Sequence, residues 1–441
     1  MLLKKYTDNI SGLQIFQIFR YGVLLLISIV FAKSNLTTEA IGEYEFFMFF
    51  SALICSFWIN GLIQSFLPLY HNNNSLKPAA GRSPAIFNAF LLITAFSLIS
   101  IILISIFKEL IIKTLTKPGE FQGFNFILLY IFFSTPAFLI EYIYLLKNQP
   151  KKILKYGFIT FSLQLLFVSM PIVLGGTIQL SFAGLVAISL IRYIWILILI
   201  KKYSTPVFSI AFIKEHLYLA LPLVFSALIG GSATYVDGLL VLFKFDSAKF
   251  ALFSYGAREF PLVLLMANAL STAFIPEFSA GKNIENTLNS LKNRSAKLMH
   301  LLFPVTMIFL LCSSRLYPLI FNRNFTESAV IFNIYLLLII SRLVFPHTVI
   351  IGLKKMKIIM YASLVELMVN ISLSTVFINI WGIEGVAFAT LIAYATQKII
   401  WVVYNKFVLG IQPAQYIPVR IFIIYSFITI ALFLFIYLNI V

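Results

Sequence analysis

Residues 250–279 read FALFSYGAREFPLVLLMANALSTAFIPEFS, an apolar stretch long enough to cross a lipid bilayer. A helix needs about 20 predominantly apolar residues for such a crossing. Arg258 and Glu259 stand side by side within the stretch. A charge inside a span costs roughly 2.5–3.5 kcal/mol on insertion scales, so such charges tend to mark function. The stretch therefore predicts a membrane span that carries a functional arginine.

The whole chain has the composition of a membrane protein. Of its 441 residues, 61% are hydrophobic and 11% are charged, whereas an ordinary soluble domain is about 25% charged. The fold class expected is therefore an all-α polytopic membrane protein. The apolar windows predict thirteen spans, at 12–32, 44–67, 85–107, 124–146, 153–175, 180–200, 216–242, 250–278, 297–320, 328–352, 358–380, 383–405 and 418–440.

The distribution of basic residues predicts the orientation of these spans. With the N-terminus in the cytoplasm, the inside segments hold twenty of the 33 lysines and arginines, and the outside segments hold eight. This bias agrees with the positive-inside rule. Topology thus accounts for the formal charge of +17, and nucleic acid is not expected as a partner. The apolar run after Lys4 and Lys5 is interpreted as a retained first helix rather than a signal peptide.

A faint internal repeat predicts how the spans are organised. SFLPLY at 65–70 and AFIPEF at 273–278 occupy equivalent positions in the two halves. Six spans followed by six spans form a parallel repeat, which is a transporter architecture with the substrate held between the halves. We therefore expect two six-helix lobes around a central cavity, plus one extra C-terminal helix. The expected boundaries are 1–205, 206–410 and 411–441.

Arginines within spans are the candidates for substrate binding. Arg20, Arg258 and Arg342 lie well inside apolar windows. The planar fork of arginine binds phosphate through two hydrogen bonds and stays charged. A water-filled cavity lined in this way would attract a pyrophosphate. Ion pairing is the structural alternative, with Glu366 as a partner for Arg342 and Glu259 as a partner for a neighbouring cation.

Two further basic residues lie nearer the inner ends of their spans. Arg192 and Lys398 are long enough to extend their charged groups toward the lipid headgroups. We expect the charged groups of both residues to lie at the lipid headgroups.

Acidic residues within spans are the candidates for ion coupling. Asp237 follows the small-residue segment GGSATYVDG, and Glu366 lies in the eleventh span. A carboxylate in the membrane can carry a proton or bind sodium. Helix pairing, or an ion pair with an arginine, is the alternative reading of Asp237.

Other chemistries find no support in the sequence. The two cysteines and four histidines have no metal-ligand or disulfide spacing. No glycine-rich phosphate loop, nucleophile elbow or His-Glu zinc motif is present. Neither a metal nor a cofactor is expected, and the chain is predicted to be a transporter rather than an enzyme.

Three stretches resemble one family of transporters. LTTEAIGEYEFFMFFSALICSFWINGL (36–62) is similar to its first loop and second helix, and residues 250–279 are similar to its eighth helix. INIWGIEGVAFATLIAY (378–394) is similar to its turn between helices 11 and 12. The family is the polysaccharide flippases of the multidrug/oligosaccharidyl-lipid/polysaccharide exporter superfamily.

The resemblance implies a function. The expected activity is translocation of undecaprenyl-pyrophosphate-linked oligosaccharides, for O-antigen and lipopolysaccharide, capsule or exopolysaccharide, to the outer leaflet of the bacterial inner membrane by alternating access. It implies that Arg20 and Arg258 contribute to a cationic cavity, whereas Arg342 matches no motif of the family. The partners expected are the lipid-linked glycan, membrane lipids and the polysaccharide polymerase machinery.

Two alternatives remain open from the sequence. A multidrug or ion antiporter of the same superfamily would bind cations, for which a cavity rich in acids is expected. A membrane polysaccharide polymerase would more naturally carry a large outside loop, and no such loop is seen.

Overall fold

The structure is a computed structural model, and it describes residues 9–72, 82–116, 121–279, 284–353 and 355–440. Within these ranges the chain is α-helical and contains no β-strand. Two compact units are formed, one by residues 1–228 with 246–251 and the other by residues 229–245 with 252–441.

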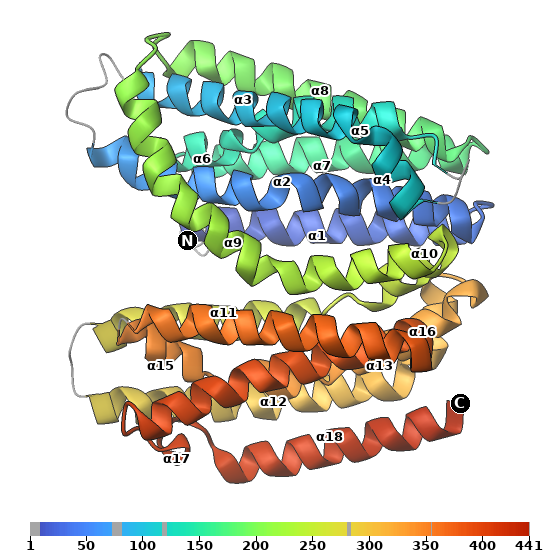
Figure 1. Ribbon diagram of the computed structural model, residues 1–441, viewed down its shortest axis with the longest axis vertical. Coiled ribbons are helices and arrows are strands. Elements are labelled where there is room, and N and C mark those ends of the chain that lie inside the picture. Colours follow the sequence, from blue (N-terminus) through green and yellow to red (C-terminus); the bar gives the residue numbers. More distant parts are fainter. Residues whose placement is uncertain (1–8, 73–81, 117–120, 280–283, 354, 441) are drawn as a thin grey trace, which may run out of the picture. The chain divides into compact units, whose positions relative to one another are not determined.

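The first unit is formed by the helices from α1 to α8, the beginning of α9 and the first residues of α10 (Ser247–Gly256), as far as the structure describes it. Figure 1 labels these helices. Those from α1 to α9 are α1 (Asn9–Lys33), α2 (Thr38–Asn72), α3 (Pro84–Ile106), α4 (Lys108–Leu115), α5 (Phe124–Ala137), α6 (Leu139–Leu146), α7 (Pro150–Val173), α8 (Ile178–Tyr203) and α9 (Ile210–Lys244). Within this unit α1 packs against α7, and α8 packs against both α5 and α7.

The second unit contains the end of α9 and most of the remaining helices. They are α10 (Ser247–Gly256), α11 (Pro261–Ser279), α12 (Ile284–Ile320), the 3-10 turn η3 (Arg323–Phe325), α13 (Thr326–Leu336), α14 (Ile339–Arg342), α15 (Pro346–Gly352), α16 (Met356–Phe407), α17 (Pro413–Tyr416) and α18 (Val419–Ile440). The boundary between the units passes through α9 and α10, and α18 packs against α12 within the second unit.

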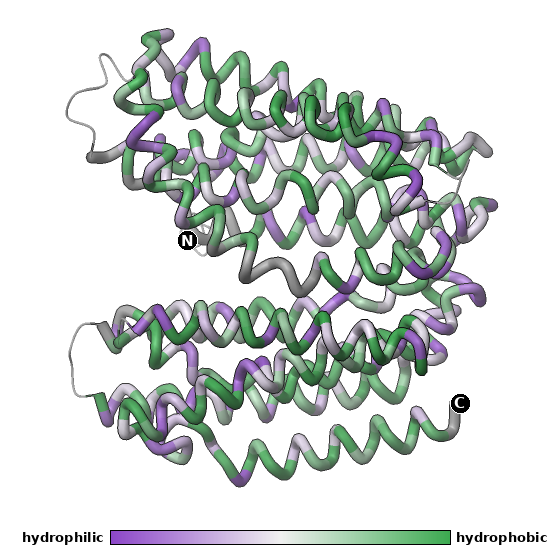
Figure 2. The backbone as a smooth tube through the Cα atoms, in the orientation of Figure 1, coloured by the Kyte–Doolittle hydropathy of each residue, from purple (hydrophilic) through white to green (hydrophobic). Residues whose placement is uncertain are grey.

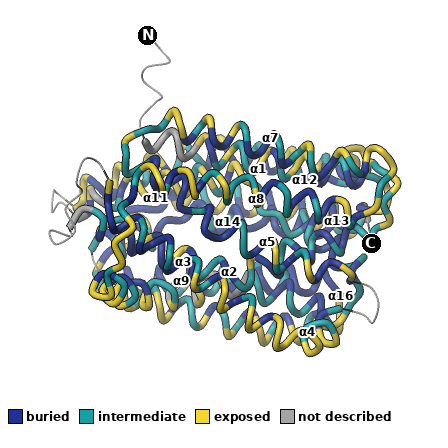
Figure 3. The backbone as a smooth tube through the Cα atoms, turned by 90° about the horizontal axis from the view of Figure 1, so that it is seen from above, coloured by how far each residue is buried: buried dark blue, intermediate teal, exposed yellow. Residues whose placement is uncertain are grey.

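The helices have the apolar character of membrane spans, as the hydropathy colouring of Figure 2 shows. Among the described residues, ten helices are long and apolar enough to cross a bilayer, or eleven if the bent pair α10 and α11 forms one span. Exposed residues occur along the helices and not only at their ends (Figure 3). Large apolar residues are among them, for example Phe158 and Phe427. A bilayer provides the apolar surroundings that such surfaces require. The expected all-α polytopic membrane fold is confirmed.

Every window predicted from hydropathy falls on described helices, but several spans are built from more than one helix. The long α16 contains two of the predicted spans. Its backbone leaves the helical conformation at Gly382, where φ is 60° and ψ is −137°. Asn370 donates to Thr390 across the two arms at 3.2 Å, and Gln397 donates to Ser363 at 3.1 Å. The arms of α16 therefore run antiparallel, as predicted for 358–380 and 383–405.

The prediction of one continuous helix over 250–278 is wrong at its centre. Residues 257–260 are not helical, and α10 and α11 meet there at a bend of 52°. Pro261 begins α11. Proline has no N–H to donate and disfavours helical backbone in the preceding residue, so a helix can begin at Pro261 but not run through it. Arg258 and Glu259 consequently lie in a helix break.

The packing of α1 against α7 orients one face of α1 toward the interior of the first unit. Gly157 on α7 allows the close approach, because a Cβ atom at this position would lie 2.4 Å from the Phe16 ring. The Phe16 ring also stacks on Tyr156, with centroids 6.0 Å apart. Residues four apart share a helix face. Phe16 therefore places Arg20 and Leu24 on the same interior face.

Candidate functional site

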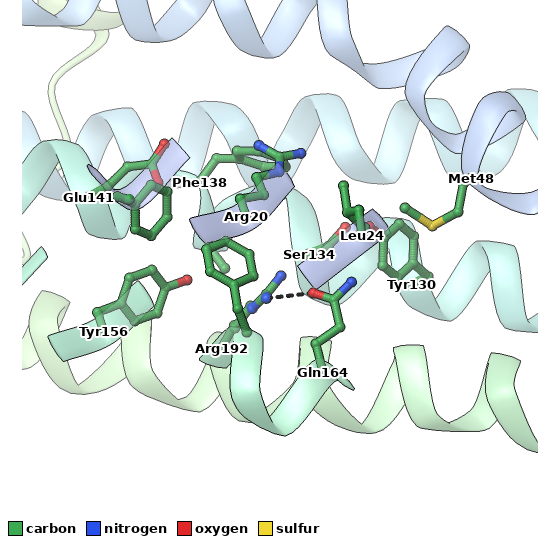
Figure 4. A pocket seen from close by; sticks show the side chains of 13 residues that line it. Arg20, Leu24, Met48, Tyr130, Ser134, Phe138, Glu141, Tyr156, Gln164 and Arg192 are labelled. Atoms are coloured by element: carbon green, nitrogen blue, oxygen red, sulfur yellow. Dashed lines mark hydrogen bonds between the residues drawn. The ribbon is translucent and has the colours of Figure 1, made fainter. Parts of the chain in front are cut away.

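A cavity inside the first unit is the candidate site. It is lined by residues of α1, α2, α5, α6, α7 and α8 and has a volume of about 50 Å³. Its longer polar side chains belong to Arg20, Tyr130, Glu141, Tyr156, Gln164 and Arg192 (Figure 4). We call it the Arg20–Arg192 cavity.

The two arginines reach this cavity from different helices. The half-buried Arg20 comes from α1, and its guanidinium carbon lies 5.8 Å from the centroid of the Phe138 ring. Arg192 comes from α8, where its Nη2 donates to Gln164 Oε1 at 2.8 Å. The guanidinium of Arg192 lies over Phe161, 5.0 Å from the ring centroid, and its buried Nε has no acceptor among the described residues. The prediction that Arg192 extends toward the headgroups is wrong.

A helix break brings the acidic member of the cavity into place. Pro136 lies at the end of α5, and α6 begins three residues later at Leu139. A proline inside a helix removes a backbone hydrogen bond and bends the chain. Glu141 follows in the first turn of α6 and is 6% exposed. Among the described residues, its carboxylate takes part in no hydrogen bond or ion pair.

Arg258 and Arg342 are placed in the second unit, where their surroundings differ. Arg258, in the break between α10 and α11, has its guanidinium carbon 4.7 Å from the centroid of the Tyr255 ring. Arg342, at the end of α14, donates to Glu259 through Nε at 3.0 Å and through Nη2 at 2.5 Å. It also lies 4.6 Å from the centroid of the Tyr394 ring. The structural alternative of an ion pair thus holds for Arg342, with Glu259 rather than Glu366 as its partner.

Asp237 on α9 lies in a buried polar cluster with both arms of α16. Its Oδ2 accepts from Thr390 Oγ1 at 2.5 Å and from Tyr335 at 3.4 Å, and its Oδ1 accepts from Asn370 Nδ2 at 3.1 Å. The Oδ1 of Asn370 and the Oγ of Ser374, one turn further along α16, are buried and have no hydrogen-bond partner in the described part of the chain. No basic group pairs with Asp237 in the described part of the chain. The alternative of an ion pair with an arginine therefore finds no support.

Two other charged residues of α16 form hydrogen bonds with uncharged groups. Glu366 accepts from the amide of Gln397, which also donates to Ser363. Lys398 is 8% exposed and donates at 3.4 Å both to the carbonyl of Val344 and to His347 Nδ1. The expected extension of Lys398 toward the headgroups is wrong.

The neutral members of both clusters were not among the residues predicted for the site. Gln164, Asn370 and Thr390 are buried, and each bonds to a charged side chain. Amides and hydroxyls are common in membrane helices, so residue type alone did not single them out. Thr390 could have been found, because it ends the GVAFAT segment of residues 378–394, one of the three stretches that resemble the flippase family.

A comparison with known families identifies the chain. The sequence profile of the family described as polysaccharide biosynthesis protein matches residues 79–330, more than half of the chain. The chain belongs to this family. The resemblance noted in the sequence is thus confirmed at the level of the family, and a search of the curated proteins gave no significant match.

Solved structures share the fold of this family member. The lipid II flippase MurJ, in an inward closed conformation, superposes with a TM-score of 0.70 at 20% identity, covering 96% of this chain and 92% of that one. A multidrug resistance MATE family transporter of the MOP superfamily, in its inward-facing conformation, gives 0.64 at 13% identity over 88% and 94%. A MOP superfamily transporter from Pyrococcus furiosus, described as having a binding pocket of reversed polarity, gives 0.58 at 13% identity over 92% and 97%. At these identities the likeness concerns the fold.

Proposed function

We propose that the protein is a flippase that moves undecaprenyl-pyrophosphate-linked oligosaccharides from the inner to the outer leaflet of the bacterial inner membrane. Family membership supports a role in polysaccharide biosynthesis. The fold similarity to a lipid II flippase and to MOP superfamily transporters supports transport by alternating access of two units. The glycans proposed are O-antigen, capsule or exopolysaccharide units, with the polymerase machinery as a later partner.

One observation carries the choice of an anionic substrate. Two guanidinium groups, Arg20 and Arg192, line a cavity that contains a single carboxylate, Glu141. In the part of the chain that the structure describes, neither arginine forms an ion pair with that carboxylate. A multidrug antiporter that binds cations would place acids where these arginines stand.

Arg258 is proposed as the second cationic contact of the substrate. The break between α10 and α11 places Arg258 outside regular helix, on a segment whose neighbour Glu259 is held by Arg342. The two hydrogen bonds of Arg342 fix the Glu259 carboxylate. We propose that Arg342 holds this break in position and that Arg258 binds the diphosphate of the substrate.

Asp237 is proposed to bind the coupling cation. Carboxylate, amide and hydroxyl oxygens are the ligands that hard cations prefer. Asp237, Asn370 and Thr390 bring such oxygens together in a buried cluster, and the Oδ1 of Asn370 accepts no hydrogen bond from the described residues. Glu366 is the weaker candidate, because Gln397 already donates to its carboxylate.

Complementation tests the proposed function. The protein is expressed in a strain that lacks its own polysaccharide flippase, and surface polymer is measured. We expect restored polymer with the wild type, and strongly reduced polymer with Arg20→Ala or Arg258→Ala at equal expression. Arg315→Ala, at an exposed arginine of α12, is the matched control and should keep full export. Full export by both test variants would refute the cationic contacts.

Analysis of the lipid-linked intermediates separates a flippase from a polymerase. Without a flippase, single units accumulate on the cytoplasmic side of the membrane, whereas without a polymerase they accumulate outside. We expect the uncomplemented strain to hold its units inside, and expression of the protein to release them.

A further inference from the structure

Lysines and tyrosines gather at one end of the first unit, where α2, α6 and α8 end and α7 begins (Figure 1). Lys147 Nζ donates to the Tyr70 hydroxyl at 2.9 Å and lies 5.6 Å from the centroid of the Tyr203 ring. Lys202 Nζ lies 5.3 Å from the centroid of the same ring, and Lys152 interacts with the Tyr203 hydroxyl. We call these five residues the Tyr203 cluster. It brings three positive charges to one tyrosine.

The turn between α6 and α7 fixes the position of the lysines on either side of it. Asn148 has a positive φ of 53°, a left-handed conformation that often ends helices and that asparagine adopts more readily than most residues. The N–H of Gln149 closes the turn by donating to a carbonyl of α6 at 2.9 Å. The side chain of Gln149 accepts from the Tyr203 hydroxyl at 3.2 Å. The turn is therefore tied to the end of α8.

Two of the three lysines have no acidic partner in the described part of the chain. Lys152 and Lys202 are exposed, and neither forms an ion pair with another described residue. Ammonium groups held close together repel one another, and each carries three N–H donors. A phosphate group among them would offset this repulsion and accept charge-assisted hydrogen bonds from more than one lysine.

Aromatic residues indicate that the cluster lies at the level of the lipid headgroups. Besides the two tyrosines of the cluster, Trp195 lies about two turns before Tyr203 on α8 and donates from Nε1 to the Tyr144 hydroxyl at 3.0 Å. Tryptophan and tyrosine concentrate at membrane–water interfaces. The distribution of basic residues predicts that this end of the unit faces the cytoplasm. Anionic lipids of the cytoplasmic leaflet attract lysines at that depth.

An exposed apolar face of α8 leads from the cluster into the membrane. Ile198 and Ile194 precede Lys202 at intervals of four residues, which share a helix face, and they are 59% and 50% exposed. With 3.6 residues per turn, Ile194 lies about 160° and Ile198 about 120° around α8 from Arg192, which lines the Arg20–Arg192 cavity. The acyl chains of a lipid bound at Lys202 can therefore follow the outer surface of the first unit, away from that cavity.

We propose that the Tyr203 cluster binds the phosphate of an anionic phospholipid, whose acyl chains lie along Ile194 and Ile198. Charge complementarity selects the headgroup, because a zwitterionic lipid would bring a positive group to the lysines. The position of the apolar face, turned away from Arg192, distinguishes this bound lipid from a transported substrate. The phosphate contacts α8 and the segments that pack against its end, so the lipid stabilises the folded first unit. This site does not depend on the proposed transport function.

Thermal unfolding of the full chain in an uncharged detergent tests this proposal, with phosphatidylglycerol and phosphatidylcholine titrated separately. A ligand that binds only the folded state raises the unfolding temperature. We expect a saturable rise with phosphatidylglycerol and little change with phosphatidylcholine. The double variant Lys152→Gln with Lys202→Gln should weaken the apparent affinity for phosphatidylglycerol by more than about tenfold, at about fivefold for each lysine. Lys152→Arg with Lys202→Arg should retain the response.

A second double variant controls for the loss of charge. Lys214→Gln with Lys297→Gln removes two exposed lysines that are also predicted to face the cytoplasm and that lie outside the cluster. This variant should respond to phosphatidylglycerol as the wild type does. Inorganic phosphate alone, and a polyprenyl diphosphate, are titrated in parallel to distinguish the sources of a phosphate group.

Each contrary outcome overturns the proposed lipid site. An equal response to the two phospholipids would exclude recognition of an anionic headgroup. A response that persists in the folded variant without Lys152 and Lys202, or that is lost equally in the control variant, would exclude a site at the Tyr203 cluster. A rise with inorganic phosphate equal to that with phosphatidylglycerol would show that the acyl chains contribute nothing. Tighter binding of the polyprenyl diphosphate at the same lysines would make the cluster a substrate site.

Discussion

Asp237 is the buried acid with the strongest case for a coupling role. Its carboxylate is surrounded by hydroxyl and amide groups of Tyr335, Asn370 and Thr390, with no basic group paired to it among the described residues. A cation that binds the folded state alone stabilises it by about 2.7 kcal/mol at a hundredfold excess over its dissociation constant. We therefore predict that sodium raises the unfolding temperature relative to choline at equal ionic strength.

Substitution at Asp237 removes that effect in this account. Asp237→Asn should unfold at the same temperature in both salts, whereas Glu366→Gln should still respond to sodium because Gln397 already occupies its carboxylate. Thermal unfolding in detergent, followed by tryptophan fluorescence, is the measurement. A wild type that is indifferent to sodium would rule out sodium at this cluster.

The pair of Arg342 and Glu259 allows a second prediction at the residue scale. The side chains are 20% and 22% exposed, and removal of one partner leaves the other charge without its two hydrogen bonds. Arg342→Gln should destabilise the fold by about 1–3 kcal/mol. Glu259→Gln in the same chain should recover part of the loss, so a double-mutant cycle should give a coupling of at least about 0.5 kcal/mol. Strictly additive effects would contradict the pairing.

Charged site residues could be found from the sequence more readily than neutral ones. Arg20 and Asp237 stand out because an ionisable group in an apolar run is costly and rare. Arg192 was misplaced because its position near an inside loop suggested contact with headgroups, whereas Gln164 holds it inside the first unit. Asn370 carries no charge, and its role depends on the return of α16 at Gly382, which residue type does not reveal.

The hairpin of α16 depends on one glycine, and this gives a prediction at the scale of an element. Gly382 has φ of 60° and ψ of −137°, a conformation open essentially to glycine alone. Gly382→Ala should cost about 1–3 kcal/mol and loosen the contact of Asn370 with Thr390. Gly22 on α1 has open space around it, so Gly22→Ala is the matched control, with little change or a slight gain in stability.

The measurement for this pair is the unfolding temperature of each purified variant. If Gly382→Ala unfolds at the temperature of the wild type, the turn does not require a left-handed residue and the account of the hairpin is wrong.

Hydropathy located the helices but not their breaks. A sliding window averages over about twenty residues, so the four residues between α10 and α11 are invisible to it. Pro261 was present as a signal, yet prolines also occur inside intact helices, such as Pro304 within α12. What separates the two positions is tertiary packing, which holds Glu259 against Arg342 at the first of them.

At the scale of the whole molecule, the thirteen predicted spans place residues 1 and 441 on opposite sides of the membrane. An N-terminus in the cytoplasm and an odd number of spans place the C-terminus outside. An alkaline phosphatase fused after Val441 should therefore be active in the periplasm, whereas the same reporter in the basic segment around Lys201 should be inactive. An inactive C-terminal fusion in a stably expressed protein would show that the number of spans is even.

The central claim is that this chain carries a lipid-linked, anionic glycan across a bilayer on its cationic groups. Translocation of a labelled polyprenyl-diphosphate saccharide in sealed vesicles that contain only the purified protein tests it most directly. The account predicts transfer well above that of empty vesicles, with most of it lost in Arg258→Ala and retained in Arg315→Ala. Transfer no faster than in empty vesicles, with protein shown to be folded, would contradict the account.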